Sequence, residues 1–187
     1  FRISAQSGYP PPASFVWTDS IGEGRQVYVY FRNEFILDAE PEKAGLNLYA
    51  SSRYALWVNG QYIQFGPARS YPKHPNYDAH DLSPYLRKGN NLIAVQVMLN
   101  GMETFQLPFH TGAFIAWGKI TGGTKSVDLA TPGSWICRRA EGYHPLAPRF
   151  SFAKGPVEVF DARLEPDNWQ SETVNQSKWK TPVVLTN

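Results

Sequence analysis

The strongest constraint on the fold is a hairpin sequence, YALWVNGQYIQFG, at residues 54–66. Asn59 and Gly60 lie between two runs in which apolar residues alternate with other residues. A type I′ turn needs positive φ at both of its central positions, and Asn-Gly adopts this turn readily. The turn also predicts the strand register, in which Val58 pairs with Gln61, Trp57 with Tyr62 and Leu56 with Ile63.

The predicted register assigns the hairpin side chains to two faces of a sheet, because successive residues of a strand point to opposite sides. The core face is expected to carry Tyr54, Leu56, Val58, Ile63 and Phe65. The outer face is expected to carry Ala55, Trp57, Tyr62 and Gln64. Trp57 and Tyr62 then form a cross-strand aromatic pair, which needs a partner because it is a large apolar surface.

The same alternation predicts further strands. Residues 26–37 are typical of a half-buried strand, with Val27, Val29 and Phe31 on the inner face and Tyr28, Tyr30 and Arg32 on the outer face. Residues 46–58 repeat the pattern with a break near Ser51 and Ser52, and residues 91–99 point Ile93, Val95 and Val97 inward. Four more strands are expected at residues 113–120, 125–129, 134–139 and 157–160.

Short turns connect these strands. Gly122-Gly123 predicts a compact turn between two of them. A single helical turn is expected at residues 81–86, with Asp81 or Ser83 as its cap and Gly89 ending it.

Eight or nine strands without a long helix predict an all-β, two-sheet antiparallel β-sandwich or jelly roll with a short polar C-terminal extension. The 15 glycines, 15 prolines and 14% aromatic residues favour short strands joined by tight turns. Residues 1–14 are expected to be a lead-in strand or linker, and residues 15–164 the sandwich domain. Residues 165–187 are expected to be an exit linker whose tryptophans, Trp169 and Trp179, dock on another surface.

Charge and cysteine content exclude several classes of function. A formal net charge of +2 without a basic run makes nucleic acid an unfavoured partner. No run approaches 18 apolar residues, so no membrane association is expected. Cys137 is the only cysteine, which excludes an internal disulfide and a thiolate metal cage but leaves a cytoplasmic, periplasmic or secreted location open.

Phe1 opens without a leader, which suggests a removed leader or a piece of a longer polypeptide.

Several segments, taken in order, resemble the amino-terminal region of bacterial α-L-rhamnosidases. They are FRNEFIL, YALWVNGQYIQFGPA, YDAHDLSPYLRKGNNLIAVQV, GSWICRR, EVFDARLEPDNW and SKWKTPVV, and together they cover roughly residues 15–185. The resemblance implies a galactose-binding-like sandwich in a bacterial multidomain glycoside hydrolase, whose acid and base lie in a helical domain further along the same polypeptide. The loop NGMETFQLPFH departs from the family because it has no Gly-Trp-Tyr stretch, so no ligand contact is carried over to it.

A complete glycosidase would need two carboxylates about 5–10 Å apart at a sugar-sized cleft. The candidates are Asp78 with Asp81, Glu103, and Glu158 with Asp161. Each has a simpler explanation: Asp81 is expected to cap a turn, and Asp161 is expected to pair with Arg163 on one strand face. The histidines, His74, His80, His110 and His144, lie mostly in loops, and Cys137 is expected to be buried in a strand. We therefore expect no catalytic residue, no metal site and no cofactor in this chain.

Binding of carbohydrate is the better-supported site chemistry, because sugar C–H faces stack on aromatic rings while amides and charged groups hold the hydroxyls. The candidate residues are Trp57, Tyr62, Arg69, Tyr71, Asn76 and Tyr77. The alternative is that these aromatics pack against a neighbouring domain of an intact enzyme.

The leading hypothesis is a non-catalytic accessory module of an α-L-rhamnosidase-like enzyme, with its catalytic helical domain and a rhamnose-containing glycan as partners. A free-standing carbohydrate-binding module or lectin, and a complete small hydrolase, are the alternatives.

Overall fold

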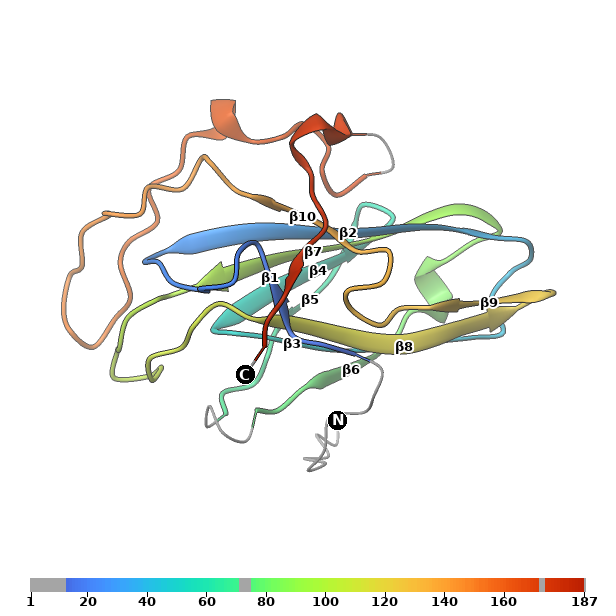
Figure 1. Cartoon of the computed structure of the whole chain (residues 1–187), viewed down its shortest axis with the longest axis horizontal. Helices are drawn as coiled ribbons and strands as arrows, with labels where there is room; N and C mark the ends of the chain where they lie inside the picture. Colours follow the sequence, from blue (N-terminus) through green and yellow to red (C-terminus); the bar gives the residue numbers. More distant parts are fainter. Residues whose placement is uncertain (1–12, 71–74, 172–173, 187) are drawn as a thin grey trace.

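Two antiparallel sheets face each other across one apolar core in the computed structural model, which describes residues 13–70, 75–171 and 174–186 (Figure 1). The six-stranded sheet has the order β11, β1, β8, β3, β6, with β9 also paired to β8. The five-stranded sheet has the order β10, β2, β7, β4, β5. The predicted all-β sandwich is therefore confirmed.

The strands of the six-stranded sheet are β1 (Val16–Trp17), β3 (Lys43–Ala50), β6 (Asp78–Asp81), β8 (Phe114–Gly122), β9 (Lys125–Asp128) and β11 (Val183–Val184). Those of the five-stranded sheet are β2 (Val27–Leu37), β4 (Arg53–Val58), β5 (Gln61–Gly66), β7 (Gly89–Leu99) and β10 (Ile136–Arg139). Short 3-10 turns are η1 (Ser83–Tyr85), η2 (Ala162–Leu164) and η3 (Gln176–Lys178). No described segment forms a helix long and apolar enough to cross a membrane.

The core is filled by the inner faces of both sheets. Val27, Val29 and Phe31 of β2 and Ile93, Val95 and Val97 of β7 lie in it, as predicted. Phe31 lies at its aromatic centre, with its ring centroid 4.4 Å from that of Phe114 and 6.1 Å from that of Trp17. Each such side chain contributes about 1.5–3 kcal/mol when fully buried, so this packing is a main source of stability.

The predicted turn between β4 and β5 is confirmed, because Asn59 has φ 50° and Gly60 has φ 81°. Two of the predicted pairs are present, Val58 with Gln61 and Trp57 with Tyr62. Asn59 also joins the hairpin to β7, the neighbouring strand in the sheet, since its Oδ1 accepts a hydrogen bond from the backbone N–H of Leu92 at 2.8 Å.

The third predicted pair is wrong, because a β-bulge shifts the register beyond Trp57. Leu56 pairs with Gln64 and leaves Ile63 as the extra residue of β5. A bulge of one residue reverses the faces of everything after it. Phe65 therefore lies opposite Ala55 on the outer side, where 56% of it is exposed, instead of in the core.

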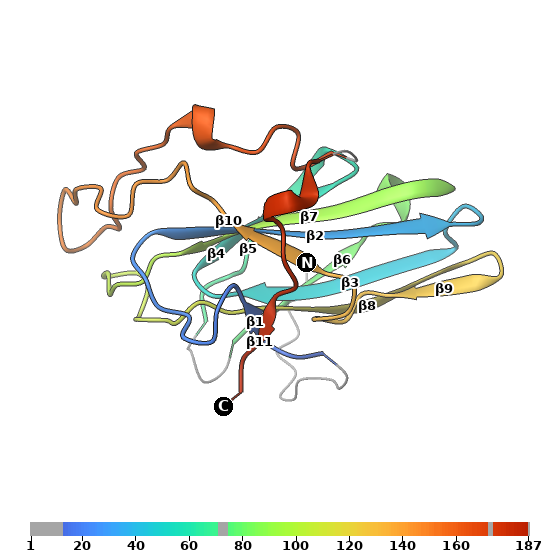
Figure 2. The same ribbon diagram turned by 45° about the horizontal axis from the view of Figure 1, so that its top comes forward.

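β2 is buried on both faces, whereas a half-buried strand was predicted. Tyr28, Tyr30 and Arg32, on the outer face, are almost fully covered. The covering residues come from the chain that follows β10, which we call the cover segment, residues 141–171 and 174–180. Figure 2 shows it in orange and red along the side of the five-stranded sheet. Trp169 and Trp179 thus pack on this chain's own sandwich.

Some predicted elements differ from the structure. Residues 157–160 form no strand, and Phe160 makes only an isolated bridge with Tyr143. Asp161 and Arg163 do form the predicted ion pair, at 2.6 Å, but at η2 and not on a strand. The short strands β1, β6 and β11 were not predicted. Because β11 pairs with β1, the end of the polar extension belongs to a sheet; its role as a linker to another domain stays a prediction.

Candidate functional site

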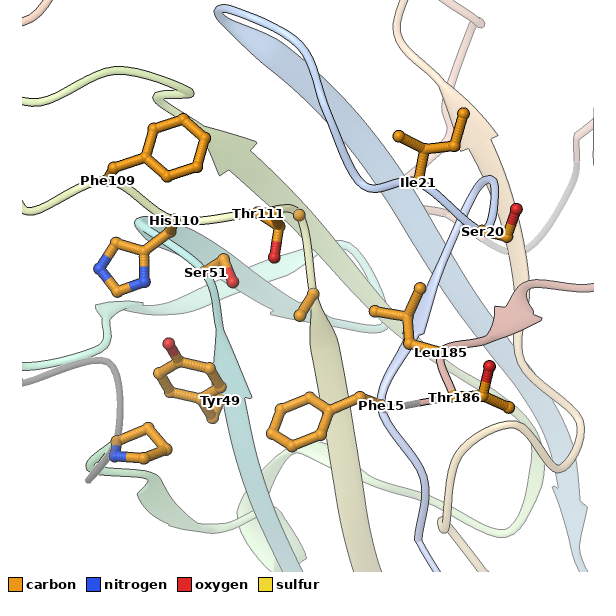
Figure 3. Close-up of a pocket in the computed structure, with 13 residues that line it drawn as sticks. Phe15, Ser20, Ile21, Tyr49, Ser51, Phe109, His110, Thr111, Leu185 and Thr186 are labelled. Carbon is orange, nitrogen blue, oxygen red and sulfur yellow. The ribbon is translucent and has the colours of Figure 1, made fainter.

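A groove of about 610 Å³ lies on the outer side of the six-stranded sheet (Figure 3). Its residues come from five separate parts of the chain, one of which contributes only Pro75. Tyr49 belongs to β3, Phe15 precedes β1, residues 109–113 form the loop before β8, and Leu185 follows β11. Concave sites of this size are the usual place for a small ligand.

Strand alternation explains why Tyr49 faces the groove. Leu46, Leu48 and Ala50 of β3 point into the core, so Tyr49 points to the opposite side of the sheet. Its ring meets Phe15 edge to face, with centroids 6.1 Å apart. Burial raises the pKa of the Tyr49 phenol, so it stays protonated and can donate a hydrogen bond at neutral pH.

The loop before β8 is held close to the sandwich by Gly112. A Cβ at this position would lie 2.2 Å from the ring of Trp17, so no larger residue fits without movement. The Gly112 N–H donates to the carbonyl of Gly22 at 2.6 Å. This anchoring sets Phe109 and His110 at the rim of the groove, and burial lowers the pKa of His110, which favours its neutral form.

The groove combines aromatic rings with uncharged polar groups. Phe15, Tyr49 and Phe109 supply the rings, while Ser20, Ser51, Thr111 and Thr186 supply hydroxyls. None of the described residues that line it is Asp, Glu, Lys or Arg. The lining therefore suits stacking and hydrogen bonding with a neutral polyhydroxy ligand, and it contains no acid and base pair.

Two of the residues predicted from the sequence, Trp57 and Tyr62, lie on the five-stranded sheet, away from this groove. Their rings form the expected cross-strand pair, with centroids 5.7 Å apart. Trp57 also meets Trp169 of the cover segment, edge to face at 5.1 Å. The partner that the sequence required for Trp57 is thus a residue of the same chain, although half of Tyr62 stays exposed.

Three other predicted residues lie near the groove but do not line it. Arg69 lines a small hollow that shares Tyr49 and His110 with the groove, and it donates a hydrogen bond to Gln106 at 2.9 Å. Asn76 follows Pro75, which lines the groove. Tyr77 packs edge to face on Trp117, 4.8 Å between centroids. Tyr71 lies outside the described residues.

The predicted set does not form one platform, because Trp57 and Tyr62 lie on the five-stranded sheet and Arg69 lies beside the groove. The sequence-based selection also missed the residues that line the groove. Tyr49 gave only a weak signal, an aromatic residue at an outward position of a strand, and Phe15 gave none, because β1 was not predicted. Phe109 and His110 carried no signal, since their place depends on the close approach of Gly112 to Trp17.

The carboxylates proposed as catalytic candidates have structural partners. Tyr54 donates a short hydrogen bond to Asp78, and its hydroxyl is 3.0 Å from Nε2 of His80. Asp81 Oδ1 accepts from the N–H and the hydroxyl of Ser83, and so holds the turn before η1, whose N-cap position is Leu82.

Other titratable residues are also engaged in structural contacts. Glu158 accepts a long hydrogen bond from Tyr28 at 3.4 Å. Arg149 donates at 3.4 Å to the backbone carbonyl of Glu103, and not to its carboxylate. Within the described residues, no three His, Cys, Asp or Glu side chains converge as a metal site would need. His74 lies outside those residues, and Cys137 is buried in β10 as expected.

Comparison with known proteins identifies the relatives of this chain. A family model described as the α-L-rhamnosidase N-terminal domain matches residues 39–187. The GH78 family rhamnosidase of Bacillus sp. GL1 is 32% identical, with a TM-score of 0.83 over 95% of this chain and 18% of that one. No curated protein sequence matches.

More distant structures share the fold alone. The α-L-rhamnosidase from Aspergillus terreus is 20% identical, with a TM-score of 0.74 over 95% of this chain and 21% of that one. A lectin from Pleurotus ostreatus in complex with GalNAc is 15% identical, with a TM-score of 0.59 over 93% of this chain and 42% of the lectin. The chain thus spans about a fifth of the rhamnosidases and under half of the lectin. With the family model matching most of its length, the chain belongs to the family of α-L-rhamnosidase N-terminal domains.

Proposed function

We propose that this chain is a non-catalytic, carbohydrate-associated module of an α-L-rhamnosidase-like glycoside hydrolase, which supports the catalytic domain and binds glycan. The observation that carries the binding role is the groove beside Tyr49, where aromatic rings and hydroxyl groups meet without a carboxylate. A glycosidase active site needs paired carboxylates, whereas a site that only holds a sugar needs stacking surfaces and uncharged hydrogen-bonding groups.

The groove places aromatic rings and hydroxyl groups side by side, and a sugar presents matching C–H faces and hydroxyls. Phe109, 54% exposed at the rim, offers a ring that can take the C–H face of a pyranose, while Phe15 and Tyr49 line the groove edge to face. Ser51 and Thr111 place hydroxyl groups beside them, and Figure 3 shows these side chains around one hollow. Arg69 in the adjoining hollow, and Asn76 and Tyr77 next to the groove, remain proposed contacts for a longer glycan. Trp57 and Tyr62 remain a second proposed surface, reduced to the exposed half of Tyr62.

Titration calorimetry with rhamnose and rhamnose-containing oligosaccharides tests the binding role. Phe109→Ala removes an exposed ring from the rim, and its matched control is Phe65→Ala, a ring of similar exposure on β5. We expect Phe109→Ala to weaken binding at least tenfold and Phe65→Ala to change it less than twofold. Absence of binding, or equal losses in the two variants, would remove the groove as the site.

The non-catalytic part of the proposal is tested separately. The chain alone should not turn over an aryl rhamnoside, while the longer enzyme should. Turnover by the chain itself would show that it is a complete small hydrolase.

A free-standing carbohydrate-binding module is the alternative, favoured by the likeness of the fold to the Pleurotus lectin. The two hypotheses differ in the gene: the accessory role requires a coding region that continues into a helix-rich catalytic domain. A stop codon soon after residue 187 would favour the free-standing module.

A further inference from the structure

Several of the most exposed apolar side chains belong to two neighbouring loops. Four of them, Phe105, Leu146, Phe150 and Phe152, are 73–86% exposed, and we call them the apolar loop surface. Phe105 belongs to the loop after β7, and the other three belong to the cover segment just after β10. Four large apolar residues exposed together are unusual on a soluble surface, and such patches mark interaction sites.

The two loops lie side by side, and one residue joins them. Arg149 donates hydrogen bonds to the carbonyls of Lys154 at 3.1 Å and Phe152 at 2.6 Å within its own loop. It also reaches the carbonyl of Glu103 in the other loop at 3.4 Å. Arg149 therefore fixes the spacing between the aromatic residues of the two loops.

The loop after β10 is also fastened to the sandwich. Gln26 donates to the carbonyl of Val157 at 2.9 Å, and Arg25 donates to the carbonyl of Ala147 at 3.0 Å. Thr104 stabilises the other loop, because its hydroxyl accepts from the N–H of Leu107 at 3.0 Å. Loops held by side chains in this way present their apolar residues in a fixed arrangement, which lowers the entropic cost of binding a partner.

A second groove, of about 300 Å³, lies between the two loops. Arg53 and Lys154 contribute positive charge to its wall, and none of the described residues that line it is acidic. Together with the exposed rings, this basic groove is complementary to a partner surface that carries apolar and acidic side chains.

We propose that the apolar loop surface and the groove beside it dock onto the catalytic part of the same polypeptide, through an apolar surface with acidic side chains. This inference rests on the proposed function, since it requires the longer enzyme. In the Bacillus rhamnosidase the matched fold is only 18% of one chain, so most of the polypeptide is a tethered neighbour. A tethered partner is present at an effective concentration of the order of millimolar, which favours a modest patch as an interface.

Hydrogen exchange of the intact enzyme, compared with this chain alone, tests the docking. We expect amides of residues 103–107 and 145–154 to exchange at least tenfold more slowly in the intact enzyme. The double variant Phe150→Ser with Phe152→Ser should abolish that protection in the intact enzyme. Ile36→Ser is the matched control, because Ile36 is 73% exposed and lies at the opposite end of β2; it should leave the protection unchanged.

Three results of the exchange experiment would overturn the proposal. They are equal exchange in the two proteins, protection that survives the double variant, and protection of the chain alone that grows with its concentration, which would make a second copy the occupant. Docking and glycan binding are tested independently. The double variant of the chain alone should bind rhamnose-containing oligosaccharides with unchanged affinity, whether or not docking occurs. Loss of glycan binding in that variant would also contradict docking, because the surface would then serve the ligand.

Discussion

Trp169 stacks on Tyr30 with ring centroids 4.2 Å apart and ring planes 23° from parallel. The two residues are far apart in the sequence, and their contact closes the outer face of β2. A second stack, Tyr143 on Tyr28 at 3.5 Å, lies along the same strand. The cover segment is therefore an integral layer of the domain over the five-stranded sheet.

Replacing Trp169 tests how much this layer contributes to stability. Trp169 is 3% exposed, so Trp169→Ala removes a buried indole and leaves a cavity over Tyr30 and Trp57. We expect the free energy of unfolding to fall by about 3–5 kcal/mol, measured by urea denaturation. Ile36→Ala, at an exposed position, should change it by less than about 0.5 kcal/mol. A small effect of Trp169→Ala would show that the cover segment is only loosely held in solution.

Arg32 fixes the cover segment through its backbone. Its fully buried guanidinium donates to the carbonyls of Trp169 and Ser171, and it pairs with Glu34. Lysine keeps the charge but lacks the planar fork that reaches these acceptors together. We expect Arg32→Lys to cost about 1–3 kcal/mol of stability and to speed proteolysis within residues 165–171.

Glu34→Gln tests the ion pair separately from the backbone contacts, because it removes the charge of Glu34 and keeps an oxygen that can accept from Arg32. It should cost under about 1 kcal/mol and leave proteolysis unchanged. Equal effects of the two variants would mean that Glu34, which also accepts a hydrogen bond from Gln176 of the cover segment at 3.3 Å, matters as much as the two backbone contacts.

The sequence predicted those features that depend on neighbours along the chain. Asn59-Gly60 specifies its turn by backbone conformation alone, and the inner faces of β2 and β7 follow from alternation. The bulge at Ile63 could not be predicted this way, because a period of two carries no sign of an inserted residue.

The sequence could not predict features made by distant segments. Tyr28 and Tyr30 look like the exposed half of a strand until Tyr143 and Trp169 cover them. The groove is similar, since Phe15 and Tyr49 are brought together only when β1, β3 and β8 align. A partner for Trp57 was predictable from its size, but its identity as Trp169 was not.

Cys137 should be inert while the chain is folded. It is buried in β10, and burial raises the pKa of its thiol to about 11. Only the thiolate attacks a disulfide reagent, so both low access and low ionisation slow the reaction. We expect no reaction with Ellman's reagent at pH 8 in the native chain, and stoichiometric reaction of one thiol in denaturant. Fast reaction of the native chain would place Cys137 in a segment that opens readily.

His80 should make stability depend on pH near neutrality. Burial lowers the pKa of His80 in the folded chain below its usual 6.5, although Asp78 opposes the shift. Between the folded pKa and 6.5, the unfolded chain binds the proton and the folded chain does not, so stability falls as pH falls through this window and is unaffected above it. Burial also lowers the pKa of His110, which acts in the same direction, and raises that of Glu165, which acts in the opposite one.

His80→Gln separates this contribution from the other two, because the difference in stability between variant and parent cancels the effects of His110 and Glu165. Glutamine can still form a hydrogen bond with the Tyr54 hydroxyl, which is 3.0 Å from His80 in the parent. We expect urea denaturation to show the parent losing its advantage over His80→Gln as pH is lowered from 7.5 to 5, by up to about 1.4 kcal/mol for each unit of pKa shift. A difference that stays constant over this range would show that His80 titrates alike in the folded and unfolded chain, and that its contact with Tyr54 is open to water.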